Sequence, residues 1–177
     1  EAAHRMDKDL ELSRAIQISA LPNATSPFPE HKEFDIYATM KTAREVGGDF
    51  YDFFFIGTDC LGFVIADVSG KGIPASLFMM SAKTELKNCM SSEHTLSNAI
   101  VKANNTLCEN NEAGMFVTAF TGILNYKTGE LRYVNGGHNF PLIRHNGTYE
   151  WLSNKSGLIL GLFSGKPYKE YTRMLSP

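Results

Sequence analysis

The stretch GGDFYDFFFIGTDCLGFVIADVSGKG, residues 47–72, decides the fold class of this chain. Within it, residues 49–56 form an aromatic run typical of a strand, and residues 61–66 form a second apolar run. The turn-forming residues 57–59 separate the two runs. Because strands joined by so short a turn must be antiparallel, the stretch predicts a hairpin rather than a parallel pair.

Strand and helix patterns on either side of this hairpin predict an α+β protein. Residues 34–41 alternate between apolar and polar side chains, as a half-buried strand does. Two helices are expected next, at 75–90 and 95–108, and either Thr95 or Glu93 could cap the second. Since two consecutive helices between groups of strands exclude a doubly wound parallel sheet, we expect antiparallel sheets with helices packed on their faces. Further strands are expected at 115–125, 131–134, 141–144, 149–152 and 168–175, with Asn146-Gly147 as a hairpin signal.

The N-terminal segment has a different pattern from the rest of the chain. Residues 2–20 place apolar side chains at roughly helical spacing, and Pro22 ends the helix. Two interpretations are open: a helix docked on the domain, or the end of a signalling helix that continues upstream. We therefore divide the chain into an N-terminal linker or signalling helix, 1–22, and a folded domain, 23–177.

Composition narrows the class of protein. The chain has 177 residues and a net charge of −2, which argues against non-specific nucleic-acid binding. Its three cysteines are widely spaced and form no CxxC pair, so neither a disulfide framework nor a zinc site is indicated. The sequence contains no apolar run long enough to cross a membrane and no signal peptide. We expect a cytoplasmic protein, although a longer parent chain tethered to a membrane is compatible with this sequence.

Two aspartates are the first candidates for chemistry. Asp49 opens the first strand of the hairpin and Asp67 closes the second, so antiparallel pairing places them side by side. Crowded carboxylates repel unless a cation or a proton lies between them. Asp52 lies three residues from Asp49 and is therefore expected on the opposite face of the strand. A structural turn aspartate remains the simpler explanation of Asp49 taken alone.

The loop after Asp67 is rich in small residues and precedes a helix. Ser69, Gly70 and Lys71 lie in it, but the spacing of a phosphate-binding GxxxxGK[ST] loop is absent. A site for a hard cation fits better, with Asp67 supplying one oxygen and backbone carbonyls and waters supplying others. No GxSxG motif accompanies the serines, so a nucleophilic triad is not indicated.

His138 follows two glycines and is the third candidate. It is either a base or ligand at the site or a structural turn histidine. The other histidines are scattered and form no HExxH pattern, so zinc chemistry has no support.

Five stretches together resemble the bacterial serine phosphatases of the SpoIIE/RsbU type, within the metal-dependent, protein phosphatase 2C-like superfamily. They occur in family order along almost the whole chain, and the stretches are 16–22, 44–52, 65–75, 115–120 and 133–139. The resemblance implies two stacked antiparallel sheets flanked by helices. It also implies a centre of two manganese or magnesium ions bound by Asp49, Asp67 and the backbone carbonyl of Val68.

The resemblance further implies the reaction and the partners. Metal-activated water would hydrolyse phosphoserine or phosphothreonine on a regulatory protein, of the kind that antagonises an anti-sigma factor. Gly48, Ser69, Gly70, Lys71 and His138 would be loop or substrate-side residues. An upstream sensor domain in the parent chain is expected, and a homodimer through the N-terminal helix is an option.

One departure from the family pattern concerns the end of the chain. After residues such as Leu175-Ser176-Pro177 the family continues to further aspartates that complete the metal site. Our hypothesis is that these 177 residues alone bind metal weakly and have little activity. The alternatives are a phosphatase-like regulatory or binding domain without catalysis, or a generic α+β binding module.

Overall fold

A computed structural model describes residues 2–23, 25, 27–42, 45–109, 111–145 and 147–176. Glu1, Arg44 and Asn146, and Pro177 at the chain end, took part in the predictions above and lie outside these residues. Among the helices of the described part, none is long and apolar enough to cross a membrane.

The predicted hairpin is present and forms one edge of the main sheet. Strands β1 (Phe50–Ile56) and β2 (Cys60–Val68) pair antiparallel, with Phe50 opposite Ala66 and Ile56 opposite Cys60. Gly57 adopts a φ of +64° in the turn, a backbone conformation that residues with a Cβ rarely adopt. The aromatic run and the turn residues therefore build the structure that their sequence indicates.

The main sheet has the strand order β1-β2-β3-β4-β7 among the described residues, and every pair in it is antiparallel. The three further strands are β3 (Val117–Asn125), β4 (Glu130–Gly136) and β7 (Tyr171–Met174). At the β3–β4 turn a Cβ on Gly129 would lie 2.3 Å from the carbonyl oxygen of Leu175. Glycine is therefore required there for the close approach of the chain end.

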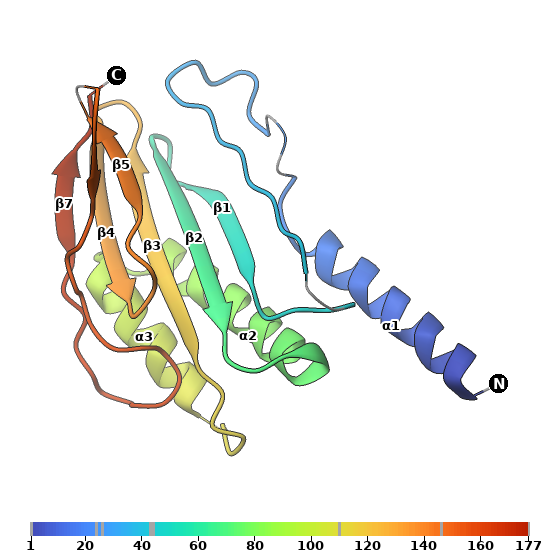
Figure 1. Cartoon of the computed structure of the whole chain (residues 1–177). Coiled ribbons are helices and arrows are strands. Elements are labelled where there is room, and N and C mark those ends of the chain that lie inside the picture. The colour runs from blue at the N-terminus through green and yellow to red at the C-terminus, as the bar shows by residue number, and fades with distance from the viewer. Residues whose placement is uncertain are drawn as a thin grey trace.

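Two helices cover one face of this sheet (Figure 1). Helix α2 (Gly72–Ser92) follows β2, and helix α3 (Leu96–Cys108) packs beside it. The Thr95 side chain accepts a hydrogen bond from the Asn98 amide, so Thr95 is the cap, whereas Glu93, the other candidate, follows the end of α2. The main core lies between the helices and the sheet and includes Val64, Met79, Leu86, Ile100, Val117 and Val134.

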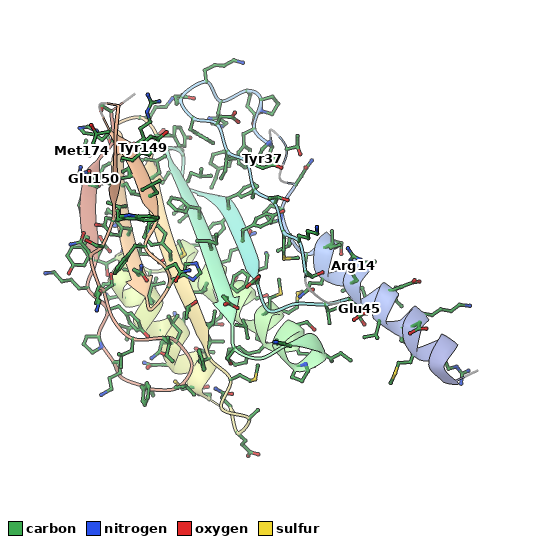
Figure 2. All side chains as sticks on the ribbon, viewed as in Figure 1. Arg14, Tyr37, Glu45, Tyr149, Glu150 and Met174 are labelled. Carbon is green, nitrogen blue, oxygen red and sulfur yellow. The ribbon has the colours of Figure 1, made fainter. Side chains whose placement is uncertain are left out.

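A two-stranded sheet lies on the other face of the main sheet. It consists of β5 (Leu142–His145) and β6 (Thr148–Trp151), and Figure 1 shows β5 in front of β4. A smaller apolar cluster joins the sheets, in which Ile143 packs with Phe120 and Tyr133. The α+β class and the two stacked antiparallel sheets are thus confirmed. Tyr149, Glu150 and Met174 mark the β6 and β7 side of the molecule (Figure 2).

The strand predicted at 34–41 is wrong. Its only β-bridge among the described residues joins Tyr37 to Thr25, and no ladder extends from it. The side chains still alternate, with Phe34, Ile36 and Ala38 partly buried. They face a groove of about 410 Å³ over β1 and β2 instead of pairing with a strand. The alternation correctly indicates an extended segment with one buried side. It does not show whether a strand lies alongside, because side-chain pattern carries no information on backbone hydrogen-bonding partners.

Helix α1 (Ala2–Ser19) contacts the domain near its C-terminal end and projects away from the sheet (Figure 1). Gln17 is 3% exposed; its Nε2 donates to the Gly47 carbonyl over 2.6 Å, and its Oε1 accepts from the Gly47 amide over 3.1 Å. Exposed apolar side chains elsewhere on the helix are Met6, Leu12, Ile16 and Ile18. Arg14 lies on this helix and Glu45 on the segment leading into β1 (Figure 2). The helix is docked through its last turns, and a signalling role stays a prediction.

Candidate metal centre

The hairpin brings Asp49 and Asp67 together. Asp49 precedes Phe50 and Asp67 follows Ala66, the first pair of the β1–β2 register, so the two aspartates face each other across the strands. Partial burial, together with the nearby Asp67 carboxylate within hydrogen-bonding range, raises the pKa of Asp49 above its ordinary value. The predicted adjacency is confirmed, and the arrangement disfavours two bare negative charges.

Gly48 allows the segment before β1 to lie close to the end of β2 and the start of α2. A Cβ at this position would lie 2.8 Å from the Val68 carbonyl oxygen and 3.3 Å from the Ala75 Cβ. Gly48 does not have a positive φ, so its backbone conformation is not the reason for this glycine. It is needed because any side chain would displace the Val68 carbonyl, the group that the family resemblance assigns to a metal.

The loop after Asp67 forms one cleft of the site. Gly70 and Lys71 line a cavity of about 230 Å³ with both aspartates and Gly48. Ser69 has a different role: its amide donates to the Phe116 carbonyl, and its Oγ accepts from the Phe116 amide over 3.0 Å. Ser69 thus ties the loop to the segment before β3.

His138 lies beside the aspartate pair in a second cleft, apart from the one that Gly70 and Lys71 line. Its Nδ1 is 2.8 Å from the Thr118 Oγ1, and its amide donates to Asn135 Oδ1 over 2.8 Å. Burial lowers the pKa of His138, and the negative charge of Asp49 partly opposes this change. The structure therefore places His138 at the site with its side chain held in one position.

Thr118 and Asn135 belong to the surroundings of the site and were missed from the sequence. Thr118 lies directly opposite Asp67 in the β2–β3 register, and its hydroxyl is 3.4 Å from the Asp67 carbonyl oxygen. Thr118 falls inside the matching stretch 115–120, but that register is needed to connect it to Asp67. Asn135 holds the turn that carries His138 and has a buried Nδ2 without a described partner.

Asp52 has no place at the site, as its spacing predicted. It lies on the helix-facing side of β1, where its Oδ2 accepts from Lys83 Nζ of α2 over 2.8 Å. Asp52 is 3% and Lys83 12% exposed. This buried ion pair explains why the aromatic strand contains a second aspartate.

Asp49 and Asp67 provide some of the oxygen ligands that a hard divalent cation needs. Both side chains offer carboxylate oxygens, the ligands that magnesium and manganese prefer, and the shared cleft leaves space for water ligands. The described residues contain no group of three or more His, Cys, Asp or Glu placed to hold a metal. The two aspartates thus form one part of a cation site, and their role as ligands stays a prediction.

Sequence comparison decides the family. The profile of stage II sporulation protein E, SpoIIE, matches residues 57–177, which is more than half of the chain. This chain belongs to the SpoIIE family. Two curated relatives align along nearly all of it. The phosphoserine phosphatase RsbU of Bacillus subtilis is 29% identical over 93% of the chain, and protein IcfG of Synechocystis is 27% identical over 90%.

The SpoIIE-family chain spans only part of the length of these relatives and shares its fold with solved structures. It spans 50% of the length of RsbU and 29% of that of IcfG. The SiaA-PP2C domain of Pseudomonas aeruginosa aligns with all of the chain and 70% of its own, at a TM-score of 0.78 and 19% identity. RsbX, solved in complex with magnesium, covers 79% of the chain and 66% of its own at a TM-score of 0.59 and 22% identity. The two structures support the protein phosphatase 2C-like fold.

Proposed function

We propose that the protein containing this chain is a metal-dependent protein serine/threonine phosphatase. The observation that carries the proposal is the Asp49–Asp67 pair at the open end of the hairpin, in a chain of the SpoIIE family. The similarity to RsbU, a phosphoserine phosphatase, supports phosphoserine or phosphothreonine as the substrate group. No triad is needed, because in this reaction class water is the nucleophile.

We assign tasks in this reaction to the aspartate pair and to three residues of the adjoining loops. Asp49, Asp67 and the Val68 carbonyl would hold two manganese or magnesium ions, and the magnesium in the RsbX structure supports this choice of metal for a relative of the same fold. When bound, these ions lower the pKa of a coordinated water and offset the charge of the phosphoryl group. Gly48 keeps the two loops close, and Lys71 at the start of α2 adds a positive charge beside the cleft.

The partners follow from the same family assignment. We propose that the substrate is a phosphorylated regulatory protein of a sigma-factor partner switch, the antagonist of an anti-sigma factor, in the cytoplasm. An upstream sensor domain would act through α1, whose exposed apolar side chains also suit a homodimer contact. A phosphatase-like regulator without catalysis is the second candidate, because the described residues supply only two carboxylates at the site.

The test is manganese-dependent hydrolysis of para-nitrophenyl phosphate by the full-length protein and its Asp67→Asn variant. We expect the variant to lose more than about 100-fold in kcat/KM, since changes merely behind metal ligands already cost 10–100-fold. Asp59→Asn, an exposed aspartate in the β1–β2 turn, is the matched control and should keep full activity. Unchanged turnover by Asp67→Asn would exclude the metal role. A protein that binds manganese by calorimetry without any turnover would support the regulator.

A further inference from the structure

Two separate clefts flank the aspartate pair. The first, of about 230 Å³, is lined by the glycine loops and Lys71. The second, of about 320 Å³, lies on the His138 side and is lined by Lys41 and Asn139 among others. Asp49 and Asp67 are the lining residues that both clefts share. Any group held at the aspartates therefore has access to both clefts.

The two clefts differ in chemical character. Four of the nine residues that line the first are glycines, so it offers backbone groups beside the Lys71 and aspartate side chains. The second combines the polar side chains of His138 and Asn139 with the apolar surfaces of Tyr51 and Ile65. A lining that combines apolar surface with a few placed polar groups is typical of ligand-binding sites. A polypeptide segment offers both kinds of group, since its backbone is polar and many of its side chains are apolar.

Two polar side chains of the second cleft, His138 and Lys41, differ in how they are held. His138 is fixed by Thr118 through Nδ1 and by Asn135 through its amide, and its Nε2 has no hydrogen-bond partner among the described residues. Lys41 is exposed and forms no ion pair with another described residue. The cleft therefore presents a rigid imidazole and the positive charge of Lys41, beside the two carboxylates whose charge the proposed metal ions would offset.

We propose that the second cleft binds the polypeptide next to the phosphorylated residue, and that Lys41 selects an acidic side chain there. The inference rests on the proposed phosphatase function, because the phosphoryl group must lie at the aspartates for the flanking chain to enter this cleft. An acidic side chain next to the phosphorylated residue would meet the Lys41 ammonium at the cleft rim. A basic side chain at the same position would be repelled.

The experiment compares two fluorescent phosphoserine peptides that differ only in having glutamate or lysine beside the phosphoserine. The full-length protein and its Lys41→Glu variant are assayed in manganese for hydrolysis and, at the start of the reaction, for binding by anisotropy. We expect the parent to prefer the glutamate peptide and Lys41→Glu to lower this preference about fivefold or more, the effect of reversing one rim charge. Lys166→Glu, an exposed lysine that lines neither cleft, is the matched control and should leave the preference unchanged.

The two readouts separate this inference from the proposed function. Hydrolysis of both peptides with a preference that Lys41→Glu leaves unchanged would overturn the cleft and leave the phosphatase intact. Lys41-dependent discrimination in binding without any hydrolysis would support the cleft and refute the enzyme. Absence of both would refute both.

Discussion

The buried ion pair between Asp52 and Lys83 leads to a sharp prediction of stability. The carboxylate is 3% exposed, its Oδ1 accepts from the Phe53 amide, and its Oδ2 accepts from Lys83 Nζ over 2.8 Å. Lys83→Met would remove the cation and keep most of the apolar stem, so Asp52 would remain buried with one oxygen unpaired. Breaking such a pair costs about 3–5 kcal/mol, since the remaining charge has lost its compensation.

The cost can be measured by urea unfolding and by thermal unfolding, both followed by far-UV circular dichroism. The single tryptophan, Trp151, is 64% exposed and so would report poorly on the core. For a chain of this size we expect the midpoint of thermal unfolding to fall by roughly 6–20 °C. The m-value should stay constant, because the surface exposed on unfolding does not change.

Two controls separate pairing from other effects of the substitution. Lys87→Met on the same helix removes an exposed lysine that lies over the Phe54 ring at 5.4 Å, and should cost less than about 1 kcal/mol. The double variant Asp52→Leu/Lys83→Met removes both charges and should recover most of the loss. If Lys83→Met stays within about 1 kcal/mol of the parent, or the double variant is no more stable than the single one, the reasoning is refuted.

Two further predictions concern the site loop and a surface pair. Gly48→Ala should weaken manganese binding in calorimetry by roughly 10-fold or more, since its Cβ would overlap the Val68 carbonyl and overpacking costs about 1–3 kcal/mol. Gly47→Ala, which meets only the Thr42 side chain, should have a smaller effect, and equal losses would contradict this account. The hydrogen bond from Lys127 lowers the pKa of Glu33 from 4.5 to about 2, so this pair stabilises the fold above about pH 4.5 and progressively less as the pH falls toward 2. Lys127→Met should lower the thermal midpoint by less than about 3 °C at pH 6, and scanning calorimetry should find this difference gone near pH 2; a gap that persists there would exclude the pair as its cause.

Several parts of the fold follow from residues that are neighbours in the sequence. The β1–β2 hairpin, the Thr95 cap and the two central helices depend on local turn geometry, helix capping and apolar spacing. The adjacency of Asp49 and Asp67 also belongs here, because one short turn sets the register of both strands. These features could be predicted from the sequence, and the structure confirms them.

Other features depend on which distant elements pack together. The segment 34–41 has the alternation of a strand and lacks a ladder, since no local pattern states whether a hydrogen-bonding partner lies alongside. Asp52 meets Lys83 only because α2 returns across β1. Gln17 meets Gly47 because the loop after α1 folds back toward it.

The candidate site likewise combines features set by neighbouring residues with features set by distant elements. Its carboxylates were predictable from one hairpin, whereas its second cleft was not. His138 reaches the aspartates through the β3–β4 pairing and through Thr118, which lies opposite Asp67 on β3. The sequence alone thus determined the pair of aspartates, because a short turn leaves one register. The tertiary structure alone decided what surrounds the pair, because strand order brings together residues that no local interaction connects.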